Sequence, residues 1–194
     1  MRQDPAHPSF PLYDAIFEHD ACGVGLLARI SGEASHDIVR DALAAVARLA
    51  HRGAVDADEQ TGDGAGILTG LPQAYFKRLW TELSGTPFEG SHIAVATFFL
   101  SRDAGSALGA SRRLIRQVLE RRGFNRLLWR EVPVNASILG VTGASSMPVT
   151  EQLLIACDGD LTPRELDRKL YAARKEIESR AATANTLFPS RRAS

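Results

Sequence analysis

Three short stretches of this 194-residue chain carry residue types and spacings that could take part in binding or catalysis. The first, HDACGVG (19–25), places Cys22 beside two glycines, so a ligand or another backbone segment can approach the sulfur closely. In His51-Arg52-Gly53, the planar guanidinium of Arg52 can hold a carboxylate through two hydrogen bonds. The third, TGDGAG (61–66), combines glycine backbone amides that can face a ligand with the carboxylate of Asp63.

Each stretch also has an ordinary structural interpretation. Cys22 is equally suited to core packing, because unpaired cysteines are among the most buried side chains, and the same holds for Cys157. Arg52 can be a solvated side chain next to a glycine that ends a helix. The 61–66 loop can be a plain turn, since it lacks both the Gly-Lys-Ser/Thr ending of a phosphate-binding loop and the context of a dinucleotide fingerprint. The residues alone leave these alternatives open.

Composition narrows the class of protein. The chain is 44% hydrophobic and 24% charged, as in a soluble globular domain, and its 23 basic residues balance 23 acidic ones. We therefore expect neither a nucleic-acid partner nor a membrane partner. Two cysteines and no clustered histidines predict no disulfide framework and no metal site. A reducing, cytoplasmic location fits best.

The pattern of apolar residues predicts elements of mixed type around these stretches. A buried strand is expected over 22–29, and an amphipathic helix should begin after Ser35 and end at His51-Arg52-Gly53. Further helices and strands are expected in alternation, which favours an α+β domain. The strands are predicted at 67–69, 93–100, 127–134 and 153–157, and the helices at 73–83, 106–122 and 163–180.

The two ends of the chain look different from its middle. Residues 1–21 contain three prolines and no apolar signal-peptide core, so we interpret them as a leader that is not a secretory signal. Residues 181–194 lack periodicity and are expected to form an irregular tail. The domain itself is placed at 22–180.

Six blocks of the sequence, in the same order, resemble the glutamine amidotransferase domain of the glutamate synthase large chain. The resemblance covers about residues 12–180, and it is specific because the blocks agree in content and in spacing. They lie at 13–25, 35–39, 51–54, 61–66, 129–135 and 168–175.

This resemblance implies an α+β, four-layer α/β/β/α sandwich of the N-terminal-nucleophile type and a class II amidotransferase activity. The leader 1–21 would be removed, leaving Cys22 as the first residue. Its thiolate would attack the side-chain amide of glutamine, form a thioester and release ammonia, with the freed α-amino group as base. Arg52 is the candidate for holding the substrate carboxylate, with Gly62 and Asp63 as further substrate-binding residues. FMN and iron–sulfur centres belong to other parts of such large chains, and we expect no cofactor here.

The sequence also departs from the family. The family's oxyanion-hole block, a His-Asn-Gly-Glu-like motif, does not occur in these residues, nor does the Arg-Phe-Ser-Thr-Asn-Thr block that precedes it. We therefore expect a domain that is incomplete at its C-terminal side, with apolar faces uncovered around 93–100. Two alternatives follow: a truncated, catalytically inactive fragment or partner-binding module, with the remainder of the synthase as a separate chain, and a standalone hydrolase of another amide.

Overall fold

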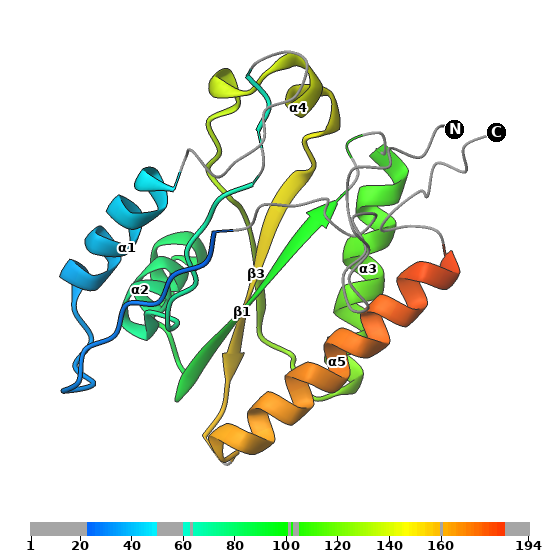
Figure 1. Ribbon diagram of the computed structural model, residues 1–194. Coiled ribbons are helices and arrows are strands. Elements are labelled where there is room, and N and C mark those ends of the chain that lie inside the picture. Colours follow the sequence, from blue (N-terminus) through cyan, green and yellow to red (C-terminus); the bar gives the residue numbers. More distant parts are fainter. Residues whose placement is uncertain are drawn as a thin grey trace, which may run out of the picture. The chain divides into compact units, whose positions relative to one another are not determined.

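The computed structural model describes residues 23–49, 60–62, 64–100, 102, 105–159 and 161–184. Two compact units share the chain: unit 1 comprises Met1–Thr69 with Gly140–Thr142, and unit 2 comprises Gly70–Leu139 with Gly143–Ser194. Helices and an antiparallel sheet alternate along the described residues (Figure 1), so the prediction of a mixed α+β fold is confirmed. No helix within the described ranges is long and apolar enough to span a membrane.

The sheet of unit 2 has three strands in the order β1-β3-β2. Strand β3 (Val149–Cys157) pairs antiparallel with β1 (His92–Leu100) on one side and with β2 (Leu127–Glu131) on the other. His92 lies opposite Cys157 in the first pair, and Leu127 lies opposite Ile155 in the second. The central position of β3 explains its continuous apolar run, because both of its faces are covered.

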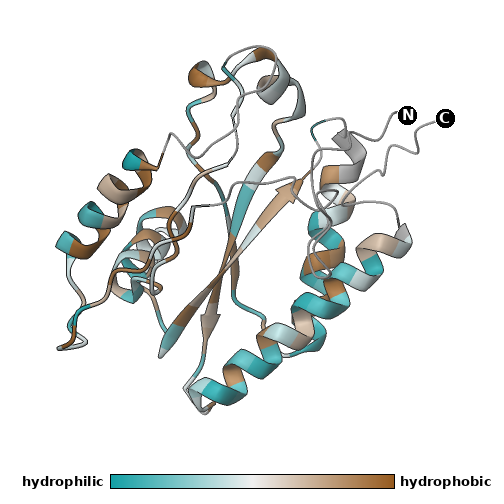
Figure 2. Cartoon of the chain, viewed as in Figure 1, coloured by the Kyte–Doolittle hydropathy of each residue, from teal (hydrophilic) through white to brown (hydrophobic). Residues whose placement is uncertain are grey.

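Helices cover the two faces of this sheet. Side chains on one face of the sheet pack against α2 (Gln73–Ser84), through a cluster centred on Phe76, Ile93 and Leu154. Side chains on the opposite face pack against α3 (Gly105–Arg121) and α5 (Pro163–Ala184), where Ile115 and Leu153 are fully buried. Figure 1 shows α3 and α5 together on one side of the strands, and Figure 2 shows polar and apolar residues alternating along α5. The helix predicted at 73–83 and the strand at 93–100 are thereby confirmed.

Local sequence sets the ends of these helices. At the start of α5, the hydroxyl of Thr162 accepts a hydrogen bond from the Glu165 amide, and the Glu165 carboxylate accepts one from the Thr162 amide at 2.9 Å. This reciprocal capping box, with Pro163 in the first turn, confirms the predicted start. At the end of α3, Gly123 adopts a left-handed φ of 84°, and the amide of Phe124 reaches back to the Leu119 carbonyl.

Two short elements were not predicted. A 3-10 helix, η3 (Ala136–Ile138), begins where the Asn135 side chain accepts a hydrogen bond from the Ser137 amide, and α4 (Val141–Ser146) follows it. Strand β2 ends at Glu131 rather than at 134, where Pro133 has no amide to extend a ladder. Strand β3 begins four residues earlier than expected, at Val149.

The main correction concerns unit 1. The strand predicted over 22–29 is wrong for its described part, because residues 23–29 form no strand and are exposed, as are the residues 67–69 predicted as another strand. A strand needs a hydrogen-bonded neighbour, and this stretch has none among the described residues. Helix α1 (His36–Arg48) begins at the predicted cap Ser35, whose hydroxyl accepts from the Asp37 amide, but it ends at Arg48. The predicted stop at 51–53 lies outside the described residues.

The uncovered apolar side chains also lie elsewhere than predicted. Ile93 and Leu100 are buried, whereas Val24 is 94% exposed, Leu26 is 91% exposed and Leu68 is fully exposed. None of the residues of α1 is buried either. Helices α2, α3 and α5 therefore cover most of the apolar surface expected to be open around 93–100, where Phe99 is 54% exposed, and unit 1 exposes apolar side chains of its own.

Candidate functional site

Unit 1 contains the stretches from which an active site was predicted. Cys22, Arg52 and Asp63 lie outside the described residues, so their positions stay predictions. Gly62 is described: it is exposed and occupies an isolated β-bridge position in the loop. The geometry next to these residues nevertheless restricts where they can lie.

The residue that follows Cys22 contacts the end of α1. A Cβ placed on Gly23 would lie 3.4 Å from both methyl carbons of Leu49, so a glycine permits this close approach. Leu49 is the C-cap of α1, and its amide bonds to the Val46 carbonyl at 3.0 Å. Three peptide units lead from Leu49 to Arg52, a reach of about 10 Å. The residue after Cys22 and the residue three positions before Arg52 are therefore in contact with each other.

The same segment is tied to the other end of the helix. Arg29 pairs with Asp37 in the first turn of α1, with 3.5 Å between guanidinium nitrogen and carboxylate oxygen. Twelve helical steps from Asp37 to Leu49 rise about 18 Å, and six extended steps from Gly23 to Arg29 span about 20 Å. Residues 23–29 thus run antiparallel to α1, with Gly23 near the C-terminal end of the helix and Arg29 near its start.

The glycine loop is open on its described side. Cβ atoms placed on Gly64 or Gly66 would meet nothing within 4 Å, and neither residue has the left-handed φ that would require glycine. No tight turn at these positions explains the two glycines. Their backbone is instead accessible to a ligand, as the binding interpretation of this loop requires.

A buried ion pair in unit 2 was not anticipated. Glu151 of β3 is only 3% exposed, and its carboxylate accepts two hydrogen bonds from the guanidinium of Arg112 on α3, one of them 2.9 Å long. The hydrogen bond to Glu151 is the main reason that the pKa of Arg112 is raised. The sequence carries little signal for it, because Glu151 lies between Thr150 and Gln152, before the apolar run 153–157. The pair contains no nucleophile, so we interpret it as structural.

Metal-binding groups are absent from the part of the chain that the structure describes: no three histidine, cysteine, aspartate or glutamate side chains there lie close enough to hold an ion. Cys157, at the end of β3, is a buried free thiol, as predicted from its packing. Burial raises the pKa of this thiol, which makes it a poor nucleophile at neutral pH.

Comparison with known proteins identifies relatives over most of the chain. Residues 22–191 match the family described as glutamine amidotransferases class-II. The chain is 39% identical over 173 residues to ferredoxin-dependent glutamate synthase 2 of Arabidopsis thaliana, covering 89% of this chain and 10% of the relative. It is 35% identical over 178 residues to the glutamate synthase [NADPH] large chain of Bacillus subtilis, covering 91% and 12%. The large chain from Azospirillum brasilense is also 35% identical, over 86% of this chain and 11% of its own length. This chain thus spans about a tenth of the length of these relatives.

Proposed function

The chain belongs to the class II glutamine amidotransferases, and from that membership we propose that it carries the glutamine-hydrolysing site of a glutamate-synthase-like enzyme, with Cys22 as nucleophile. One observation carries the proposal: the family match begins at Cys22 itself. Cys157 is the other cysteine of the chain, and its burial and raised pKa make it unsuited to the role.

The proposed reaction has two steps. The sulfur of Cys22 attacks the amide carbon of the glutamine side chain, the carbon–nitrogen bond breaks, and ammonia leaves with the proton that the thiol gave up. Water then attacks the resulting thioester, releasing glutamate and restoring the thiol. Ammonia would pass to an acceptor elsewhere in the complete enzyme.

A base is needed to take the thiol proton. Hydrolysis of the bond between Ala21 and Cys22 would free an α-amino group whose ordinary pKa, about 7.7–8.0, suits proton transfer near neutral pH. The residues 1–21 are then a propeptide. His19 and Asp20 would leave with the propeptide, so the α-amino group is the base that this arrangement keeps beside Cys22.

Substrate binding is assigned by charge. The guanidinium of Arg52 would hold the α-carboxylate of glutamine, the carboxylate of Asp63 would pair with its α-ammonium group, and the Gly62 backbone would line the site. The contact between Gly23 and Leu49 supports this assignment, because Gly23 directly follows Cys22 and Leu49 precedes Arg52 by three residues.

The complete domain would be the four-layer sandwich of N-terminal-nucleophile enzymes. Further strands would cover the apolar side chains that unit 1 exposes, such as Val24 and Leu26. The remainder of the synthase, on the same or a separate chain, would supply them together with the oxyanion donors. We place this activity in the cytoplasm.

The test is ammonia release from glutamine, measured with the purified chain supplied with the downstream segment of a synthase, and with its Cys22→Ala variant. We expect release to depend on Cys22 and on a mature mass lacking residues 1–21, which leaves 173 residues (194 − 21). Turnover by a chain that keeps Met1 would exclude the α-amino base. Arg52→Lys keeps the charge but loses the planar fork, so it should raise KM more than it lowers kcat. Arg40→Lys, on the exposed side of α1, is the matched control.

A second candidate function is a non-catalytic module that requires a partner chain. The exposed apolar side chains of unit 1 favour it, since such surfaces mark interaction sites. Binding of the downstream segment of a synthase in trans without any Cys22-dependent ammonia release would support this candidate over the catalytic one.

A further inference from the structure

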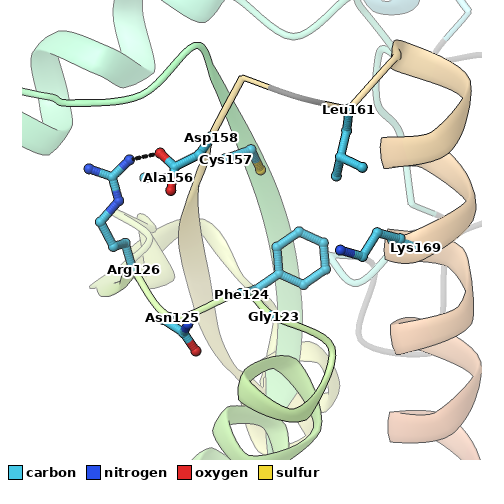
Figure 3. Close-up of a pocket in the computed structure, with 9 residues that line it drawn as sticks. All are labelled: Gly123, Phe124, Asn125, Arg126, Ala156, Cys157, Asp158, Leu161 and Lys169. Atoms are coloured by element: carbon cyan, nitrogen blue, oxygen red, sulfur yellow. Dashed lines mark hydrogen bonds and ion pairs between the residues drawn. The ribbon is translucent and has the colours of Figure 1, made fainter.

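A pocket of about 210 Å³ opens in unit 2 at the end of the sheet, and none of its lining residues belongs to the stretches that carry the proposed glutamine site. Its walls come from the turn after α3, the end of β3 and the first turns of α5 (Figure 3). Phe124, Cys157 and Leu161 supply apolar surface, and the ammonium group of Lys169 points in from α5. Asn125 and the ion-paired side chains of Arg126 and Asp158 lie on the side opposite Lys169 (Figure 3).

Lys169 differs from the other lysines of the chain, Lys77 and Lys175. Each of the three ammonium groups lies 5.4–5.8 Å from the centre of an aromatic ring. Lys77 also donates a hydrogen bond to the Ser91 carbonyl at 2.8 Å, and Lys175 pairs with Glu178 at 2.8 Å. Within the described part of the chain, Lys169 has neither a hydrogen-bond acceptor nor a carboxylate partner.

Among the described residues that line the pocket, Lys169 carries a positive charge without a counter-charge. Arg126 and Asp158 neutralise each other, and the Lys169 charge is felt at the Cys157 sulfur, where it opposes the rise in pKa that burial causes. The ammonium group lies 3.8 Å from a Cβ placed on Gly123, so it also stands beside the C-terminal end of α3. A half-buried cation next to an apolar wall is well placed to accept an anion with an apolar body.

We propose that this pocket binds a small carboxylate, with the carboxylate on Lys169 and the carbon chain against Phe124 and Leu161. One uncompensated charge matches one carboxylate better than the multiple charge of a phosphate. The available volume suits a body of a few carbons. The site is separate from the proposed glutaminase chemistry, and binding can be measured without any turnover.

Because the chain has three lysines, the signal of each one can be followed separately. Reductive methylation with ¹³C-formaldehyde keeps the lysine charge and gives one NMR signal for each lysine. The probe is butyrate, titrated into the full 194-residue chain at constant ionic strength, with chloride, inorganic phosphate and butylamine as comparison solutes. Lys169→Gln identifies the Lys169 signal, and Lys175→Gln is the matched control on the same helix.

We expect butyrate to shift the Lys169 signal in a saturable manner and to leave those of Lys77 and Lys175 in place. In ligand-observed measurements on unmethylated protein, Lys169→Gln should weaken butyrate binding about tenfold or more. Lys169→Arg should retain most of it, and Lys175→Gln should have no effect. An unmoved Lys169 signal, equal shifts of all three signals, or a stronger response to phosphate than to butyrate would each overturn the proposal. In the first case, Lys169 serves only as a counter-charge to the end of α3.

Discussion

Removing Arg112 should destabilise unit 2 far more than removing a neighbouring arginine on the same helix. The Glu151 carboxylate is enclosed between strands: Phe98 lies opposite it on β1, and Glu131 lies opposite it on β2. Arg112 provides its two hydrogen bonds, and the guanidinium carbon lies 5.6 Å from the centre of the Trp129 ring. The carboxylate is thus almost inaccessible to water and lies beside a second acidic residue.

The size of the expected destabilisation follows from the difference in burial between Arg112 and Glu151. Loss of one partner from a buried pair costs about 3–5 kcal/mol, because the other charge stays buried without compensation. Since the Arg112 side chain is 43% exposed, we take the lower end, about 3 kcal/mol, for Arg112→Met. Glu151→Gln should cost only about 1 kcal/mol, because the arginine it leaves can turn toward water and the amide still accepts one hydrogen bond. The double variant Arg112→Met/Glu151→Met should be more stable than Arg112→Met alone.

Urea unfolding followed by circular dichroism measures these differences. With a slope of about 2 kcal/mol/M, Arg112→Met should lower the midpoint by about 1.5 M. The matched control is Arg116→Met, one turn further along α3, where an exposed pair with Glu120 at 3.6 Å is worth less than about 0.5 kcal/mol. If Arg112→Met costs no more than Arg116→Met, or no more than Glu151→Gln, the burial argument is wrong.

Three further outcomes follow from the same unit. Gly123→Ala should cost about 1–2 kcal/mol in urea unfolding, because its φ of 84° is strained for any residue with a Cβ; Gly123→Asn should recover part of this loss. Gln73→Leu should cost about 1–3 kcal/mol, since the Gln73 amide bonds both to the amide of Ile93 at 2.9 Å and to its carbonyl at 2.8 Å; hydrogen exchange at Ile93 should accelerate in parallel, and an unchanged rate would contradict this role. The pKa of Glu176 is held below its usual range, mainly by hydrogen bonds from Arg122. The stability that the ionised Glu176 contributes is therefore present above about pH 4.5 and is lost as the pH falls through the pKa of the folded state. Glu176→Gln should therefore flatten the acid side of the stability profile, and an unchanged profile would show that this carboxylate does not link α5 to α3.

Elements with complete local signals were predictable from sequence. The start of α5 was predicted from Thr162 and Pro163, and the structure adds a glutamate three residues after the threonine that completes a capping box. Helix α3 carried a long amphipathic repeat ending near a glycine, which is the information that fixes a helix against a sheet. Strand β1 was predictable because an apolar run of strand length lies between turn residues.

The local sequence could not predict which residues pair when they lie far apart along the chain. Residues 23–29 have the composition of a buried strand, yet strand formation depends on a neighbouring ladder that no local feature specifies. The register that sets Glu151 beside Glu131 is likewise a tertiary property, and so is the choice of Arg112, among the arginines of α3, as the residue that faces this carboxylate.

The protein family was easier to predict from this sequence than the geometry of the site. The candidate nucleophile, the arginine and the glycine loop were identified by residue type and order, and the family match over 22–191 supports the class of enzyme without reference to where each side chain lies. Among the described residues, the segment after Cys22 is held to α1 by the contact of Gly23 with Leu49 and by the ion pair of Arg29 with Asp37. A substitution such as Gly23→Val would push this segment from α1 while leaving every candidate catalytic group unchanged. Loss of ammonia release in that variant, with an unaltered fold of unit 2, would show that the placement of Cys22 relative to α1, rather than the residues alone, makes the site.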